Sequence, residues 1–600
     1  MAVRSGRARR RRGRPDEEAP GRTVEVAGMR IEYDVPVPMD DGVVLRADVF
    51  RPAAPGRYPA IVSYGPYGKG LPYQWGYRDQ WRALIRAFPE VAEGSSCRYQ
   101  NWEVVDPEKW VPDGYACVRV DSRGAGRSPG LLDIFSPRET QDFAACIEWV
   151  AARSWCNGKI GLNGISYYAI NQWLVAGLQP PHLAAMCAWE GAADYYRDWH
   201  RHGGILCTFT GSWFKAQVET VQHGVGTRGA VDPNTGELVA GPDTLPDSVL
   251  ALNRVDPQRE ALRRELDDSW YRERSADWSR VTVPFLSAGN WGGQGLHLRG
   301  NVEAFAQAAS NRKWLEIHGL EHWTHFSTHY GLALQKRFFD HFLKGLDNGW
   351  DREPPVLLQI RHVDGFEPRK ETAWPLDGTR WTRFYLSPAD RTLRPDPPAA
   401  QAAATYRALE EGVTFSTAPF EAPTEVTGPV AAKLFIASST ADADLFLVLQ
   451  LFDPHGREVT FPGAVEPRAP IAQGWLRASH RKLDRQRSTP YRPYHAHDER
   501  QPLVPGQVYE VDVEIWPTCI VIPPGYRLTL TVQGRDLERP VSGETLGPWQ
   551  AMRGSGPFVH NHPWDRRPEI YGGRVTVYGG GATPSFLLLP VVPDRHGGRG

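Results

Sequence analysis

Residues 159–169, with the sequence KIGLNGISYYA, place a serine between a strand pattern and a helix pattern. The run Lys159–Asn163 is typical of a short buried strand, and apolar residues at helical spacing begin at Ile170. Ser166 therefore falls on a tight strand-to-helix turn, where small flanking residues let neighbouring backbones approach. Such a turn exposes the hydroxyl above a sheet and directs the N–H groups of a helix N-terminus to the same point. We predict that Ser166 is a nucleophile.

The turn departs from the usual G-x-S-x-G pattern. Tyr168 stands where the last glycine is expected, and Ala169 supplies a small residue one position later. A serine that merely caps a helix gives the same local pattern. The interpretation of Ser166 therefore depends on the elements around it.

Strand and helix patterns alternate on both sides of this turn. Short apolar runs occur at 59–64 and 115–121 before it, and at 283–288 and 313–317 after it. Apolar residues from Phe143 to Val150 recur at helical spacing between two of these strands. Strand, helix and strand in short succession predict a parallel sheet with crossover helices, the α/β class.

The chain of 600 residues is too long for a single hydrophobic core. The loss of strand pattern after residue 192 predicts a mostly helical insertion, and short strands with Pro/Gly turns after residue 379 predict a β-sandwich. We expect a disordered basic tail (1–27), a first core part (28–192), a helical cap (193–281), a second core part (282–379) and a C-terminal β-sandwich (380–600).

Composition narrows the class of protein. The net charge of −1 gives no general attraction to nucleic acid or to a membrane surface, although seven arginines lie between residues 4 and 14. No apolar stretch is long enough to span a membrane. The seven cysteines show no paired spacing and are expected to be free thiols. We therefore expect a cytoplasmic enzyme that needs no cofactor and binds neither nucleic acid nor membrane; whether it forms a homo-oligomer is left open.

Five motifs together resemble the cocaine esterase / X-Pro dipeptidyl-peptidase family of serine hydrolases (the CocE/NonD type). They are PMDDGV (38–43), YGPYGK (64–69), VDSRGAGRS (120–128), GISY (164–167), and VTGPV with DADL (426–430 and 442–445). The resemblance runs from about residue 30 to 592. It implies an α/β-hydrolase core, a helical cap inserted after the nucleophile helix, and a C-terminal jelly-roll β-sandwich.

The resemblance also implies roles for single residues. Ser166 matches the nucleophile, Tyr67 matches a tyrosine whose hydroxyl donates to the oxyanion, and Tyr167 supplies a second donor through its backbone N–H. The base should follow the strand at 313–317. Matching the exit loop of that strand to the family's pattern gives His322, which we prefer, whereas matching on Trp-x-His gives His325.

The expected acid of the triad is missing. Gly292 stands where the family carries Asp, and no Asp or Glu occurs from 281 to 302. Three interpretations stay open: Asn290 orients the histidine, a carboxylate from elsewhere such as Asp194 or Glu190 folds in, or the protein hydrolyses slowly or needs another type of substrate.

These features predict a serine hydrolase that cleaves an ester or amide through an acyl-enzyme, with an acyl ester, an acyl-amino acid or an X-Pro-type peptide as the small-molecule substrate. The alternative is a catalytically weakened homologue that acts as a binding protein. A zinc hydrolase is disfavoured, because the spacing His322-x-x-His325 lacks the H-E-x-x-H pattern, and no metal is expected.

Overall fold

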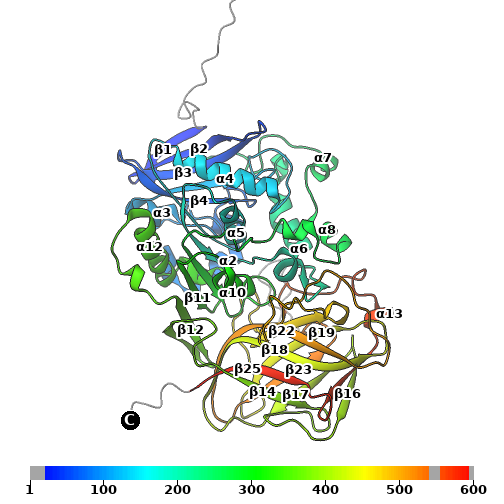
Figure 1. Ribbon diagram of the computed structural model, residues 1–600. Coiled ribbons are helices and arrows are strands. Elements are labelled where there is room, and N and C mark those ends of the chain that lie inside the picture. Colours follow the sequence, from blue (N-terminus) through cyan, green and yellow to red (C-terminus); the bar gives the residue numbers. More distant parts are fainter. Residues whose placement is uncertain (1–20, 540–554, 594–600) are drawn as a thin grey trace, which may run out of the picture.

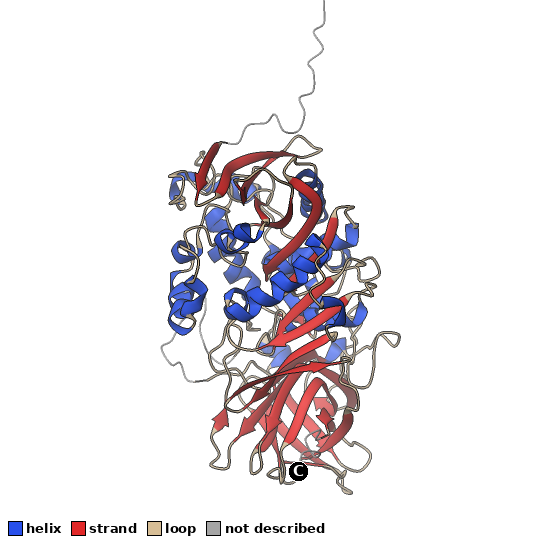
Figure 2. Ribbon diagram, turned by 90° about the vertical axis from the view of Figure 1, so that its left-hand side faces the viewer, coloured by secondary structure: helices blue, strands red, loops and turns tan. Residues whose placement is uncertain are grey.

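The computed structural model describes residues 21–539 and 555–593 (Figure 1). An α/β part occupies the upper half of the view and a β-rich part the lower half (Figures 1 and 2). The arginine-rich stretch at residues 4–14 lies outside the described residues. The ordered sheet begins earlier than the expected residue 28, because Arg22–Val26 pairs antiparallel with the next strand.

An eleven-stranded sheet forms the first part, in the order β1-β2-β3-β5-β4-β6-β7-β10-β11-β12-β13. Its strands are β1 (Arg22–Val26), β2 (Met29–Pro38), β3 (Val44–Pro52), β4 (Tyr58–Gly65), β5 (Ala116–Asp121), β6 (Cys156–Ile165), β7 (Leu183–Trp189), β10 (Phe285–Asn290), β11 (Lys313–His318), β12 (Val356–His362) and β13 (Gly365–Glu371). Neighbours from β5 to β12 are parallel. The predicted α/β-hydrolase core is confirmed, and the expected strands at 59–64, 115–121, 159–163, 283–288 and 313–317 are all present.

Helices cover both faces of this sheet. The α-helices of this part outside the cap are α1 (Tyr73–Gly76), α2 (Arg78–Ala87), α3 (Pro107–Trp110), α4 (Pro137–Ala151), α5 (Tyr167–Leu178), α10 (Leu298–Gln307), α11 (Thr324–Ser327) and α12 (His329–Lys344), and α13 (Pro568–Tyr571) lies in the C-terminal part. Successive side chains of β4 point to opposite faces of the sheet and so belong to two different hydrophobic clusters. Val62 packs with Phe143 of α4 and Trp173 of α5 on one face, whereas Ile61 packs with Phe339 of α12 on the other. Burial on both faces explains why the parallel strands read as continuous apolar runs.

The segment between β7 and β10 consists of short helices, loops and a small hairpin. It contains η4 (Tyr195–His200), β8 (Arg201–His202), β9 (Ile205–Leu206), α6 (Phe209–Trp213), η5 (Phe214–Val218), α7 (Asp247–Leu252), α8 (Pro257–Arg263) and α9 (Ser269–Arg272). Its helical content is more broken than the expectation of a helical cap suggests, because Gly and Pro interrupt the chain between residues 224 and 246.

The C-terminal part is the expected β-sandwich of jelly-roll type. It contains β14 (Arg380–Ser387), β15 (Thr392–Arg394), β16 (Ala402–Arg407), β17 (Gly412–Thr417), β18 (Thr424–Ser438), β19 (Asp444–Phe452), β20 (Glu458–Val459), β21 (Ala472–Arg477), β22 (Tyr509–Ile522), β23 (Arg527–Gln533), β24 (Arg574–Gly579) and β25 (Phe586–Val592). An additional pairing of β18 with β25 folds the sheet back on itself. Its inner faces enclose an aliphatic core that includes Leu447, Val513 and Leu530.

The two parts share an apolar interface. Trp291, which follows β10, and Ile317 of β11 belong to the same buried cluster as Phe446, Trp475 and Trp516 of the sandwich. The loops at the carboxyl ends of the core strands therefore lie against the sandwich, at the edge where α/β proteins place their sites. None of the described helices combines the length and the apolar character needed to span a bilayer. All seven cysteines are free and buried.

Candidate active site

Ser166 lies on a strained turn between β6 and α5. Its backbone adopts φ 56° and ψ −114°, an uncommon conformation for a residue with a side chain. A β-carbon at Gly164 would come within 2.4 Å of the β-carbon of Tyr168, so the turn requires glycine there. Tyr168 replaces the usual last glycine of the motif because Gly65 leaves room: a β-carbon at Gly65 would meet the Tyr168 ring at 2.6 Å.

The hydrogen-bond partner of the serine hydroxyl is a histidine that the sequence did not single out. The distance from Ser166 Oγ to His297 Nε2 is 3.1 Å, and both side chains are buried. Burial and the neighbouring charge of His322 keep the pKa of His297 well below its ordinary value. A neutral imidazole can accept the serine proton. His297 was not predicted because it directly precedes α10, in the segment where the family's acid was expected and not its base. The sequence signal for it is that it is the one histidine between residues 281 and 302.

His322 lies beside this pair. Its ring stacks on that of His297, with centroids 4.8 Å apart and planes inclined by 13°. Its Nδ1 lies 2.9 Å from Glu190 Oε2, and its Nε2 lies 2.9 Å from Glu103 Oε1. Burial lowers the pKa of His322, but the charge of Glu190 and hydrogen bonds to Glu103 and Glu190 raise it to about 10. His322 is therefore an imidazolium between two carboxyl groups, and its role as the base stays a prediction.

Glu190 takes the place beside His322 where a triad needs its acid. It follows β7 directly, at φ 51°, and is fully buried. Burial would raise its pKa, but the charge of His322 and hydrogen bonds from His318 and His322 hold the pKa well below the ordinary value. The sequence left three interpretations of the missing Asp open. The observed contact matches the second of them, because a carboxylate from the end of β7, that of Glu190, lies beside His322.

Asn290 supports this carboxylate. Its Nδ2 donates to Glu190 Oε1 at 3.2 Å and to the Leu320 carbonyl at 2.8 Å, and its Oδ1 accepts from Gly292 N–H. Asn290 thus contacts the acid and not the imidazole. Glu190 also receives a hydrogen bond from His318, at 3.1 Å.

Two further candidates lie apart from this cluster. Asp194 caps η4 and forms an ion pair with Arg197 at 2.9 Å, so its carboxylate is engaged elsewhere. His325 packs against His318 and Tyr330, and its Nδ1 has no hydrogen-bond partner among the described residues. The structure brings neither of them to Ser166.

The expected oxyanion donors are near the serine. Tyr67 lines the same pocket, and its hydroxyl oxygen accepts from Trp213 Nε1 at 3.1 Å, which leaves the hydroxyl proton free to donate. Burial raises the pKa of Tyr67, so it stays a phenol. Tyr167 is the first residue of α5, and its backbone N–H has no acceptor within the helix.

The pocket above Ser166 is mostly apolar and rich in aromatic side chains. Its walls come from the core, from the cap segment and from the sandwich. The lining residues are Tyr67, Gln80, Trp102, Glu103, Ser166, Trp199, Phe209, Trp213, Gln217, Leu296, His297, His322, Trp323, Ala464, Val465 and Phe558. Apolar walls around a few converging polar groups are typical of a small-molecule site.

Ligand atoms of Glu190, His297 and His322 all lie within 4.8 Å of one another, which would suit a metal ion. Their hydrogen bonds favour another use. Both nitrogens of His322 face carboxyl oxygens, and Nε2 of His297 faces the serine hydroxyl. This bonding pattern is that of a proton-transfer site.

Three features define the class of protein: a parallel sheet with helices on both faces, a strained turn that carries Ser166, and a buried histidine hydrogen-bonded to the Ser166 hydroxyl. They are those of a serine hydrolase of the α/β-hydrolase type. Residues 41–327 match the model of the X-Pro dipeptidyl-peptidase (S15) family, and residues 348–547 match that of the X-Pro dipeptidyl-peptidase C-terminal non-catalytic domain. A CocE/NonD family hydrolase from Staphylococcus aureus is 31% identical, with a TM-score of 0.81, over 98% of this chain and 100% of that one.

The chain therefore belongs to the CocE/NonD family of hydrolases, which cleave ester or amide bonds. Cocaine esterase of Rhodococcus is 25% identical over 85% of this chain and 91% of its own length. The Xaa-Pro dipeptidyl-peptidase of Streptococcus gordonii is 20% identical over 84% of this chain and 73% of its own length.

Proposed function

We propose that the chain hydrolyses neutral esters with an apolar or aromatic acyl group, with Ser166 as nucleophile and His297 as the group that takes its proton. The observation that carries the assignment is the 3.1 Å contact between His297 Nε2 and Ser166 Oγ. As the serine oxygen bonds to the carbonyl carbon, its proton passes to His297 Nε2 and the carbonyl electron pair moves to oxygen. The imidazolium then protonates the leaving alkoxide, and water repeats the sequence on the acyl-enzyme.

The charges around His297 support this role. Among its neighbours, the carboxylate of Glu190 favours a proton on His297, and His322 opposes it. The lowered pKa of His297 keeps the ring neutral, so that Nε2 offers a lone pair to the serine proton, and makes the ring a weaker base than an ordinary imidazole. His322, held by Glu190 and Glu103, fixes the face of the His297 ring through stacking.

The alternative assignment gives the proton to His322. The contact between His322 Nδ1 and Glu190 Oε2 favours it, because an acid on Nδ1 is the arrangement of a catalytic triad. In that case His322 Nε2 would have to leave Glu103 and turn toward Ser166. The fold and the reaction class are the same under both assignments, and they differ only in the histidine that acts as base.

The pocket walls support the choice of substrate. Of the described residues that line the pocket, Glu103 is the one acid; its Oε1 faces His322, and burial raises its pKa, which disfavours the charged carboxylate. A peptide with a free N-terminal ammonium would need an unengaged carboxylate to pair with it. The aromatic lining instead suits an uncharged acyl group.

Hydrolysis of matched substrates tests the proposal. We expect wild-type protein to cleave an aromatic p-nitrophenyl ester with a higher kcat/KM than an X-Pro p-nitroanilide, and a fluorophosphonate probe to label wild type but not Ser166→Ala. His297→Gln should lower kcat at least as much as His322→Gln, whereas His325→Gln, at a half-buried histidine away from Ser166, should leave kcat within a few fold. A full retention of kcat in His297→Gln would assign the base to His322, and unlabelled wild type would refute the nucleophile.

A further inference from the structure

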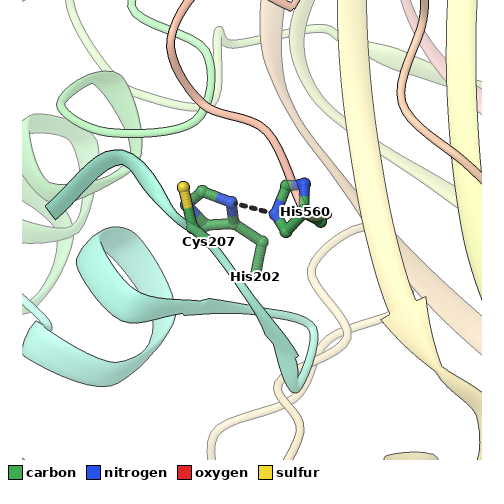
Figure 3. Close-up of side chains that lie close together, drawn as sticks. All are labelled: His202, Cys207 and His560. Carbon is green, nitrogen blue, oxygen red and sulfur yellow. Dashed lines mark hydrogen bonds between the residues drawn. The ribbon is translucent and has the colours of Figure 1, made fainter. Parts of the chain in front are cut away.

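A second cluster of metal-ligating side chains lies outside the Ser166 pocket. His202 ends β8, Cys207 follows β9 in the same hairpin, and His560 comes from the C-terminal part of the chain (Figure 3). All three side chains are buried, and their ligand atoms lie within 4.8 Å of one another. From these contacts we propose that His202, Cys207 and His560 bind one zinc ion, which fastens the cap hairpin to the sandwich.

The neighbours of the two histidines decide where their protons are. His202 Nε2 lies 3.2 Å from the backbone carbonyl of Asp198, which can only accept, so Nε2 carries the hydrogen. His560 Nδ1 lies 2.8 Å from Asp536 Oδ1, and the same argument places a hydrogen on Nδ1. Each neutral ring therefore keeps its lone pair on its other nitrogen.

These two nitrogens, His202 Nδ1 and His560 Nε2, face each other at 2.8 Å. Two lone pairs in direct contact repel, so a cation belongs between them: either one additional proton or a metal ion. A proton would satisfy the two rings alone and would give Cys207 no part. A metal ion uses the Cys207 sulfur as well, which lies within 4.8 Å of the ligand nitrogens, because thiolate and imidazole are the ligands that zinc prefers.

The contacts that the other ring nitrogens of His202 and His560 make are also typical of a metal site. Histidines that bind metals usually donate their other N–H to a carboxylate or a backbone carbonyl, as His560 does to Asp536 and His202 to Asp198. Zinc lies about 2.0–2.1 Å from imidazole nitrogen in a tetrahedral site, so the two nitrogens would separate by about 0.5 Å to admit it, and a water molecule would be the fourth ligand. On binding, the Cys207 sulfur forms a bond to zinc and its proton leaves to the solvent buffer.

The position of the cluster gives the ion a structural role. Thr208 N–H donates to the Val559 carbonyl at 2.9 Å, so the residues adjoining Cys207 and His560 are already in contact. Phe209 and Phe558, next along the two segments, lie with ring centroids 4.9 Å apart and both line the Ser166 pocket. A zinc ion here would hold two walls of that pocket together. The inference is independent of the proposed ester hydrolysis, and Ser166→Ala should bind zinc as wild type does.

Metal analysis of the full-length protein, expressed with added zinc, tests the proposal. We expect one zinc per chain in wild type, none in Cys207→Ala, and one in Cys146→Ala, the matched control at another fully buried cysteine. Zinc-edge X-ray absorption of wild type should give one sulfur and two imidazole nitrogens, and needs no variant to fold. Wild type without zinc would overturn the proposal and leave a bridging proton. Zinc retained in a folded Cys207→Ala, or a shell without sulfur, would overturn it as well.

Discussion

The backbone of Gly292 lies against that of Gly463, so closely that a β-carbon at position 292 would come within 2.4 Å of Gly463 Cα. Ala464 N–H donates to the Gly292 carbonyl, and His322 N–H donates to the Ala464 carbonyl. The sandwich loop thus occupies the space into which a side chain at position 292 would project, and the same loop helps to hold His322. The carboxylate that contacts His322 Nδ1 is that of Glu190.

An Asp placed at position 292 should therefore give His322 no new carboxylate partner. We expect Gly292→Asp to lower the free energy of unfolding by at least about 1–3 kcal/mol, because backbone atoms must shift to admit the side chain. Thermal unfolding measures the loss, and Gly365→Asp, at a glycine whose β-carbon would meet nothing within 4 Å, is the control expected to change little. If Gly292→Asp rescued the activity of a Glu190→Gln enzyme, this account of the acid would be wrong.

Glu190→Gln should damage both catalysis and stability. Glu190 bonds His322 and not His297, so with His297 as the base we expect kcat to fall by less than the roughly 10⁴ that losing the acid of a triad costs. The change also leaves the buried charge of His322 with less compensation, which we expect to cost about 3–5 kcal/mol. Steady-state kinetics and thermal unfolding measure the two effects.

Glu316→Gln separates these effects. Glu316 bonds His318 Nδ1 at 2.7 Å and accepts from the Tyr330 hydroxyl, on the side of His318 away from Glu190. We expect it to lower the unfolding temperature while kcat changes by less than roughly tenfold, since His322 keeps its partner. Equal losses of kcat in the two variants would argue that Glu190 acts on folding alone.

The pH dependence of kcat/KM should distinguish the two histidines. His297 must be neutral to accept a proton, and its lowered pKa keeps it neutral well below pH 6.5. His322 should stay protonated in its position, and its pKa of about 10 keeps it so at neutral pH. We therefore expect a plateau from mildly acidic pH to about pH 9, with a fall near pH 10, measured with an ester that has no ionisable group. If His322 were the base, activity would instead rise toward pH 10.

Local patterns allowed much of the fold to be predicted. The core strands read as apolar runs because they are buried on both faces, and the serine turn had a motif of its own. The cap was harder to predict, because its short helices depend on tertiary contacts more than on periodicity.

Site residues could be predicted only where they belong to a motif within one segment of the sequence. Ser166, Tyr67 and Tyr167 belong to motifs, but Glu190, Glu103 and His297 come together from three separate segments. Glu190 was named only as one possible carboxylate from elsewhere in the chain, because no spacing in the sequence links it to His322. Ala464 and Phe558 line the pocket because the sandwich packs against the α/β core. No local sequence pattern predicts how these two parts pack.

Removing the hydroxyl of Tyr67 tests the oxyanion site. Tyr67→Phe keeps the ring contacts with Tyr167, Tyr168 and Trp213 but removes the donor expected to face the oxyanion. Losing one such donor costs about 10²–10³ in kcat, so we expect that fall with KM changed by only a few fold. Trp213 Nε1–H also loses its acceptor, at a cost of about 1–3 kcal/mol in stability. The matched control is Tyr77→Phe, which removes a hydroxyl bonded to Gln217 and should leave kcat nearly unchanged. A rise in KM with kcat unchanged in Tyr67→Phe would show that the hydroxyl binds the substrate in its ground state and does not hold the oxyanion.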